Sequence, residues 1–154
     1  ALSTKKPRSS ERCSVMTFED CIRKGLIKKS ESAKERVEQS LSLGDKFSKS
    51  AEKNSEMLEY EVCEIISYNA LFHYARALLF NAGYIERSHA CLFLSLKRFY
   101  PEHGELFDKA DKIRLERHNL QYAGFSADKE SARFVLEFVK EFERIVKKLL
   151  KNKK

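Results

Sequence analysis

The chain has 154 residues, the size of one domain, and its five glycines and two prolines provide few of the turns that a many-stranded fold needs. The net charge is +7, to which residues 1–14 contribute +3 and residues 147–154 contribute +5. The body between these ends is therefore near neutral. For this reason the overall basicity does not by itself indicate a nucleic-acid-binding globular surface.

In chain order, residues 1–14 are basic and rich in serine, and we expect them to be disordered. Residues 15–150 show the helical period of apolar residues, and residues 151–154 form a basic tail. No alternating pattern of the kind that predicts a strand stands out. The sequence therefore predicts an all-α fold, an antiparallel bundle of five or six helices.

The helix limits are predicted from capping residues, with Thr17, Ser30 and Ser126 suited to begin helices and Gly83 and Pro101 suited to end them. The expected helices cover about 18–28, 30–53, 56–81, 86–99, 104–121 and 126–150. The helix at 56–81 is apolar on nearly every face, so we expect it to be the core helix.

The four cysteines form no C-x-x-C pair and have no histidine at the spacing of a zinc site. Cys63 and Cys91 lie in apolar helical runs, where a thiol is most often a small core residue. We therefore expect a reducing, cytoplasmic location, no metal and no cofactor. No apolar run approaches the roughly 18 residues that cross a bilayer, so we expect no membrane partner.

The core helix carries Asn69, His73 and Arg76 at spacings of four and three, which places them on one stripe. Polar groups buried on such a helix need partners, so these residues are candidates for binding a phosphate or nucleotide. The histidine His73, like His89 further along, is more often a satisfied core group than a metal ligand.

A second polar feature lies in the helix at 104–121, where Arg117 falls in the middle of the apolar side and Arg114 at its edge. Arginine is rarely buried unpaired. One interpretation is that the two side chains pair with acids or helix ends. The alternative is a cationic cleft for a phosphate or an RNA backbone.

Two strings resemble the HEPN family (higher eukaryotes and prokaryotes nucleotide-binding domains), in its small prokaryotic branch. They are Tyr68-Asn-Ala-Leu-Phe-His-Tyr-Ala-Arg-Ala-Leu-Leu79 and Gly83-Tyr-Ile-Glu-Arg-Ser-His89. With the amphipathic last helix, the resemblance covers about residues 17–150. It implies a helical bundle, a homodimer, and a ligand that is a nucleotide or RNA.

Family members with ribonuclease activity carry an Arg followed after four to six residues by a His on the penultimate helix. Counted from Arg114 or Arg117, every allowed position here lacks histidine, and the expected one is Leu120. Leucine cannot transfer a proton. We therefore expect little or no metal-independent ribonuclease activity, although His118 or Tyr122 could replace the missing group in an active ribonuclease toxin.

Members of this branch are often paired with a minimal nucleotidyltransferase in what resembles a toxin–antitoxin system. The transferase can attach a nucleotide to a tyrosine two residues past the motif histidine, and Tyr122 matches that tyrosine. An ordinary aromatic at a helix end is the plainer interpretation of Tyr122. A purely structural interaction module with ion-paired arginines is the third functional alternative.

The last helix supports the expected homodimer. Its apolar side chains exceed what one intramolecular contact obviously needs; they are Phe134, Phe138, Phe142, Val146 and Leu150.

Overall fold

The computed structural model describes residues 15–124 and 126–152. The predicted disorder of residues 1–14, the last two residues of the basic tail, and Phe125 of the turn before the last helix lie outside the described residues. The elements in chain order are α1 (Phe18–Arg23), β1 (Ile27–Lys29), the 3-10 turn η1 (Ala33–Arg36), α2 (Val37–Glu56), α3 (Tyr60–Asn81), β2 (Tyr84–Glu86), α4 (His89–Phe99), the 3-10 turn η2 (Pro101–His103), α5 (Gly104–Tyr122) and α6 (Lys129–Lys151).

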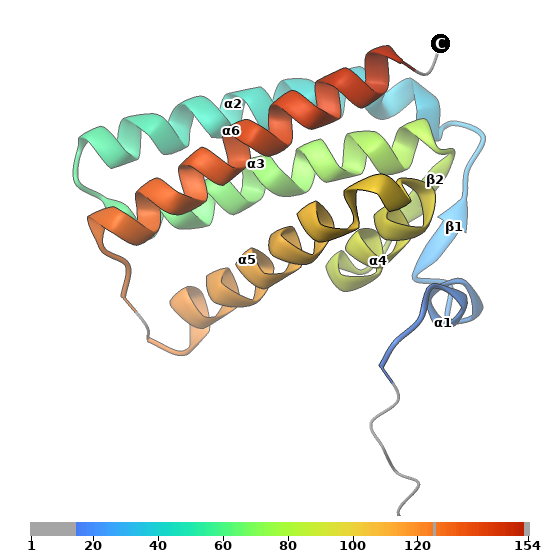
Figure 1. Cartoon of the computed structure of the whole chain (residues 1–154), viewed down its shortest axis with the longest axis horizontal. Coiled ribbons are helices and arrows are strands. Elements are labelled where there is room, and N and C mark those ends of the chain that lie inside the picture. Colours follow the sequence, from blue (N-terminus) through green and yellow to red (C-terminus); the bar gives the residue numbers. More distant parts are fainter. Residues whose placement is uncertain (1–14, 125, 153–154) are drawn as a thin grey trace, which may run out of the picture.

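The predicted all-α bundle is confirmed, with α3 as its central helix. The long helices α2, α3 and α6 lie side by side, α5 runs below them, and α4 lies near the end of the bundle that carries α1 and β1 (Figure 1). Helix α3 packs against α2, α4, α5 and α6. Its buried side chains point in all directions around its axis, as expected for a helix that is apolar on every face.

One glycine sets the close approach of α2 and α3. A Cβ atom at Gly44 would lie 2.6 Å from Cε1 of Tyr74, so only glycine fits under that ring. The Tyr74 hydroxyl donates to Asp45 Oδ1 at 2.6 Å, and Lys147 of α6 reaches the same carboxylate oxygen at 2.9 Å. These contacts join α2, α3 and α6 at one point.

The two short strands were missed by the sequence analysis. They pair antiparallel, with Ile27 opposite Glu86 and Lys29 opposite Tyr84. Strands of three residues are too short to show a convincing alternation, and their partners lie far apart in the chain. The strand pair places Glu86 beside α3, which matters for the site described below.

Several helix limits also differ from the prediction. Ser30 does not cap α2, which follows η1 and begins at Val37. The last helix is capped by Asp128 in a capping box with Ser131, and not by Ser126. The C-terminal glycine of α3 is confirmed, because Gly83 has a φ of +87° and donates its N–H to Phe80 O at 3.0 Å.

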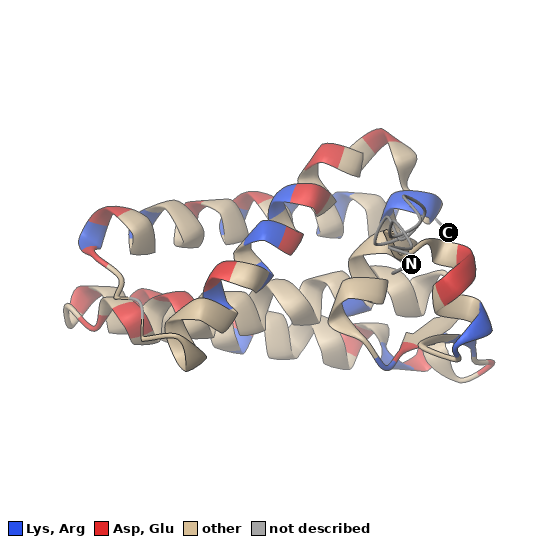
Figure 2. Cartoon of the chain, turned by 90° about the horizontal axis from the view of Figure 1, so that it is seen from below, with Lys and Arg blue, Asp and Glu red and all other residues tan. Residues whose placement is uncertain are grey.

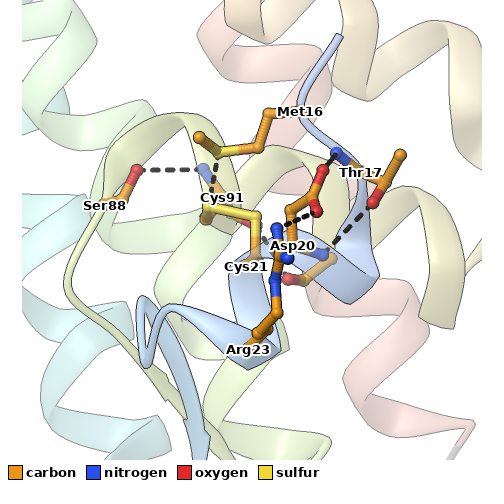
Figure 3. Close-up of a disulfide and its surroundings, with 8 residues drawn as sticks. Met16, Thr17, Asp20, Cys21, Arg23, Ser88 and Cys91 are labelled. Atoms are coloured by element: carbon orange, nitrogen blue, oxygen red, sulfur yellow. Dashed lines mark hydrogen bonds and ion pairs between the residues drawn. A yellow bond between two sulfur atoms is a disulfide. The ribbon is translucent and has the colours of Figure 1, made fainter. Parts of the chain in front are cut away.

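A disulfide joins Cys21 of α1 to Cys91 in the first turn of α4, with 5.8 Å between the Cα atoms (Figure 3). The expectation of a free core thiol at Cys91 is therefore wrong, although Cys63 is a buried free cysteine as expected. Disulfides persist mainly in oxidising compartments. The cysteines consequently no longer indicate a reducing compartment, and the cytoplasmic location stays a prediction.

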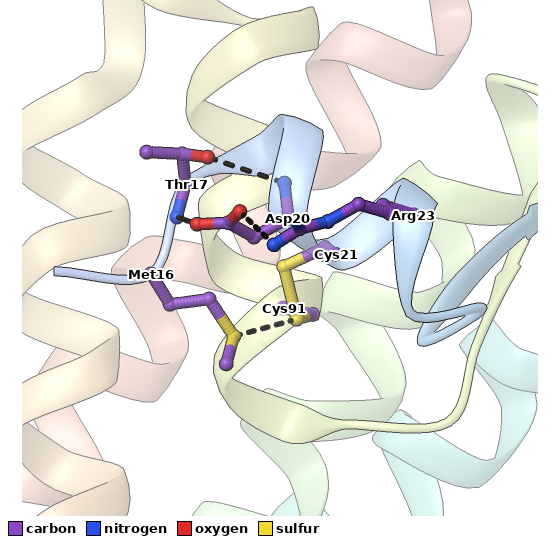
Figure 4. A network of polar contacts seen from close by, with 6 residues as sticks. All are labelled: Met16, Thr17, Asp20, Cys21, Arg23 and Cys91. Atoms are coloured by element: carbon purple, nitrogen blue, oxygen red, sulfur yellow. Dashed lines mark hydrogen bonds and ion pairs between the residues drawn. A yellow bond between two sulfur atoms is a disulfide. The ribbon is translucent and has the colours of Figure 1, made fainter. Parts of the chain in front are cut away.

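The short helix α1 is held by local contacts around this disulfide. Thr17 and Asp20 form a capping box, Arg23 pairs with Asp20 at 2.7 Å, and Met16 Sδ lies 3.5 Å from Cys91 Sγ (Figure 4). Six residues are too few for a stable isolated helix. The cap and the disulfide together therefore fix α1 against α4.

Charged side chains of both signs are interspersed along the helices (Figure 2). This agrees with the near-neutral body predicted from the sequence. Any concentration of positive charge must therefore come from the local arrangement of a few side chains.

Candidate functional site

Three helices bring a tyrosine, an arginine and a histidine together. Tyr68 of α3 is almost fully buried, with 1% of its surface exposed. The guanidinium carbon of Arg117, from α5, lies 4.6 Å from the centre of the Tyr68 ring. The Tyr68 hydroxyl is hydrogen-bonded at 2.6 Å to Nδ1 of His89, the first residue of α4. We call these three residues the Tyr68 site.

The environment of His89 keeps its ring neutral near neutral pH. Burial lowers the pKa of His89 from its ordinary value of 6.5, and the positive charges of Arg117, Arg114 and Arg76, with His73, lower it further. Burial likewise raises the pKa of Tyr68, so the phenol stays protonated. Arg117 therefore supplies the full positive charge of the Tyr68 site.

Arg117 has no carboxylate at ion-pair distance among the described residues. Its Nη1 donates to the Gln121 side-chain oxygen at 2.6 Å, while its buried Nε has no hydrogen-bond partner. Arg114 differs, because its Nε lies 2.6 Å from Asp111 Oδ1 one turn earlier. Each interpretation of the arginine pair therefore fits one of the two residues. Arg114 is ion-paired, and Arg117 is a cation that lies on an aromatic ring.

Along α3, aromatic and cationic side chains follow one another every four residues. The ring of His89 stacks on Phe72 with 4.0 Å between centroids, and Tyr68 lies next to Phe72 at 6.4 Å. The guanidinium of Arg76 lies between two rings, 5.3 Å from Phe72 and 5.0 Å from Phe80. We call the row Tyr68, Phe72, Arg76 and Phe80 the α3 ridge.

Arg76, one of the residues predicted to bind phosphate, already has a counterion. Its Nε lies 2.9 Å from Glu86 Oε1, and the Glu86 side chain is only 6% exposed. Burial raises the pKa of Glu86, and the charge of Arg76 opposes that shift. Arg76 therefore stabilises a buried acid of β2, and it contributes less free charge to the site than the sequence suggested.

The other two residues of the predicted stripe have separate environments. His73 stacks on Phe47 of α2 at 5.4 Å, and its Nδ1 is buried without a hydrogen-bond partner among the described residues. Burial, followed by the charge of Arg76, lowers its pKa. Asn69 is half-buried. His73 is consequently not the satisfied core histidine that the sequence suggested.

The residues predicted to replace the motif histidine lie on the outer side of α5. His118 and Tyr122 contact each other, with ring centroids 4.9 Å apart, and 71% of Tyr122 is exposed. Leu120 is half-buried. Arg117 instead meets the ring of Tyr68, whose hydroxyl binds His89, so the histidine close to this arginine comes from α4.

The sequence analysis missed Tyr68, Phe72 and His89 as members of the site. The repeat of four along residues 68, 72, 76 and 80 was a usable signal, since such a row forms one ridge of a helix. The sequence could not predict that His89 and Arg117 both contact Tyr68, because these contacts depend on how α4 and α5 pack on α3.

A comparison of the sequence with models of protein families finds a match, which covers the helices that form the Tyr68 site. A model of the HEPN domain matches residues 37–149, which include α2 to α5 and most of α6. The chain belongs to the HEPN domain family. Neither the curated proteins nor the solved structures contain a match to it.

The described residues of this HEPN domain protein contain no group of three His, Cys, Asp or Glu side chains placed to hold a metal ion. None of their helices is both long and apolar enough to cross a membrane.

Proposed function

We propose that this HEPN domain protein binds a nucleotide or RNA through phosphate contacts at the Tyr68 site. The observation that carries the proposal is the guanidinium of Arg117, which is fixed on the Tyr68 ring and has no carboxylate partner among the described residues. A phosphate bound by the guanidinium would neutralise its charge. Arg114 lies one turn away and adds a second, already paired, guanidinium.

The test is fluorescence anisotropy with a labelled single-stranded RNA at low salt in EDTA. We expect Arg117→Gln to weaken binding about tenfold, as loss of a charge-assisted contact of roughly 1.5 kcal/mol would do. Arg144→Gln is the matched control, because Arg144 is an exposed cation on α6. No binding by the wild type, or equal binding by both variants, would reject the proposal.

The proposal includes a partner nucleotidyltransferase in a toxin–antitoxin-like pair. Tyr122 supports it, because its side chain is exposed at the last residue of α5 and can reach a second protein. In the reaction, the Tyr122 oxygen attacks the α-phosphate of a nucleoside triphosphate, loses its proton, and displaces pyrophosphate. Mass spectrometry after incubation with the transferase and the triphosphate should show one added nucleotide on the wild type and none on Tyr122→Phe.

Binding without cleavage is part of the same proposal, since Leu120 occupies the motif position of the proton-transfer group. A metal-independent ribonuclease is the second candidate, favoured by the position of His89. This residue could accept or donate a proton close to a phosphate held by Arg117, because both contact Tyr68.

An RNA-cleavage assay in EDTA separates the two functions. We expect no cleavage by the wild type. Cleavage that is lost in His89→Gln would establish the ribonuclease, and loss in His118→Ala or Tyr122→Phe would move the proton-transfer role to the outer side of α5.

A further inference from the structure

The disulfide is bonded to the segment of the chain that serves the Tyr68 site. Cys91 lies two residues after His89, in the first turn of α4. Glu86, the counterion of Arg76, lies three residues before His89 on β2. Residues 86–91 therefore carry the counterion of Arg76, the hydrogen-bond partner of the Tyr68 hydroxyl and one half of the disulfide.

The disulfide is also the main attachment of α1 to the bundle. Cys21 is the one buried residue of this helix. Helix α1 also meets α4 through the edge contact of half-buried Phe18 with Phe99 and the ion pair of Glu19 with Arg98. The two side chains of that pair are 67% and 54% exposed, so the pair contributes little to stability. Loss of the bond to α4 would consequently free α1.

A free α1 would loosen the strand pair that follows it. Leu26 donates its N–H to Cys21 O at 2.9 Å, and its own carbonyl accepts from the Arg87 N–H at 2.8 Å. The strands have three residues each, and an isolated pair of strands is at best marginally stable. The disulfide therefore helps to hold, through α1 and β1, the position of Glu86 on β2.

A loosened Glu86 would leave Arg76 as a free cation beside the Tyr68 site. The Arg76 side chain is 27% exposed, and with Arg36 it lines a hollow of about 270 Å³, so an anion can reach it. The Phe72 ring lies 5.3 Å from the Arg76 guanidinium carbon and 4.0 Å from the His89 ring centre. Only one ring therefore separates the freed charge from the Tyr68 site.

We propose that the Cys21–Cys91 disulfide is a redox switch of anion binding. The oxidised protein keeps Glu86 on Arg76 and binds its ligand weakly, whereas the reduced protein releases Glu86 and binds more tightly. The inference rests on the proposed function for the ligand and adds its regulation.

The reductant is a dithiol, and the reaction is thiol–disulfide exchange. One thiolate of the dithiol attacks a cysteine Sγ, breaks the S–S bond and displaces the other cysteine as a thiolate, which takes up a proton. The second thiol then closes on the mixed disulfide and displaces the remaining cysteine, so two electrons and two protons pass to the protein and the dithiol becomes a disulfide. Both cysteines are fully buried, so the attack proceeds from a local opening of α1.

Amide hydrogen exchange, followed by mass spectrometry, tests the structural step without any ligand. The wild type is compared before and after anaerobic treatment with dithiothreitol, and alkylation of the thiols verifies the reduction. We expect faster exchange in residues 18–29 and 84–86 of the reduced protein, while α3 keeps its slow exchange. Cys63→Ala, which removes the buried free cysteine, is the control and should respond as the wild type does.

Anisotropy with the labelled single-stranded RNA, in EDTA, tests the effect on binding. We expect reduction to tighten binding by the wild type about tenfold, as one added charge-assisted contact would do. The slope of log affinity against log salt should become steeper by about 0.7. Glu86→Gln removes the counterion in both states, so its oxidised form should bind as tightly as the reduced wild type and should not respond to dithiothreitol.

The switch is overturned by unchanged exchange in residues 18–29 and 84–86 of the reduced protein, or by exchange that rises equally in α3. It is also overturned by equal RNA affinity of the two redox states, or by a redox response that persists in Glu86→Gln. If the two states bind RNA equally and Arg117→Gln still weakens binding, the proposed function survives alone. A wild type that binds no RNA in either state removes the proposed function, and the control of binding with it.

Discussion

Arg117 is the residue whose environment is hardest to explain by folding alone. A buried N–H without a partner costs roughly 1–3 kcal/mol, and folded proteins contain few such groups. The cation–aromatic contact with Tyr68 returns part of that cost. In the proposed function, a phosphate bound by the guanidinium would also neutralise the charge of Arg117, which has no carboxylate at ion-pair distance among the described residues.

The pKa of His89 leads to a prediction at the same scale. Burial and neighbouring cations lower it below 6.5, so between the lowered value and 6.5 the folded state binds fewer protons than the unfolded state. Its contribution to stability is therefore present above 6.5 and is lost as pH falls. His89→Gln should show a smaller loss of unfolding free energy between pH 7.5 and pH 5.5 than the wild type.

Urea unfolding at the two pH values measures this difference. The buried acids Glu64 and Glu86 have raised pKa values and act in the opposite direction, but they are present in both proteins and cancel in the comparison. The same pH dependence in wild type and variant would contradict the described environment of His89.

Residue roles could be predicted only where one helix carries the whole pattern. The inward position of Arg117 follows from the apolar side of the helix at 104–121, and it is confirmed. The spacing of Asn69, His73 and Arg76 could not predict the ion pair of Arg76 with Glu86, which lies on a strand later in the chain. Partners that come from another element are set by tertiary packing, which spacing does not encode.

At the scale of elements, the position of each helix was predictable, including the start of α1 after its cap Thr17, but the strand pair and η1 were not. The core helix ends at its predicted residue but begins four residues later than predicted, and the helix at 104–121 ends one residue later than predicted. The strand pair depends on pairing between distant segments, and α1 is shorter than the predicted 18–28 because the chain enters β1 at Ile27. The disulfide was missed for the same reason, because Cys21 and Cys91 are separated by 70 residues.

The disulfide provides a prediction about these weak elements. Closing a loop of 70 residues stabilises the folded state by roughly 4 kcal/mol in the chain-entropy account. The double variant Cys21→Ala, Cys91→Ala should lose up to that amount in denaturant unfolding, and a reducing agent should destabilise the wild type and leave the variant unchanged. Equal stability of the wild type with and without reductant would contradict a formed disulfide.

At the scale of the whole molecule, the proposed homodimer cannot use the whole apolar face of α6. The apolar face of α6 was thought to be in excess, but Phe138, Phe142 and Val146 are buried within the chain at 7%, 0% and 0% exposure. The predicted excess is therefore wrong for these three side chains, whereas Phe134 is exposed as the prediction requires. Leu115, Tyr122 and Phe134 are the exposed apolar side chains of α5 and α6, and the proposed dimer now depends on them.

Light scattering tests the dimer. We expect twice the 18.0 kDa chain mass at tens of micromolar protein, and a shift toward the single-chain mass for Phe134→Glu. Ile22→Glu, in an exposed position on α1, is the control and should remain dimeric. A wild-type protein that keeps the mass of one chain at this concentration would contradict the homodimer.

The central claim is that Arg117 holds a phosphate of the ligand, and its own Nε–H reports this most directly. In proton–nitrogen NMR spectra, the Arg117 signal is assigned by its absence in Arg117→Gln, and the protein is then titrated with single-stranded RNA in EDTA. If Arg117 holds a phosphate, this signal should shift because a negative charge binds beside the guanidinium, while the Arg144 signal should not move. An Arg117 signal that stays in place while RNA binding shifts the signals of other arginines would contradict it.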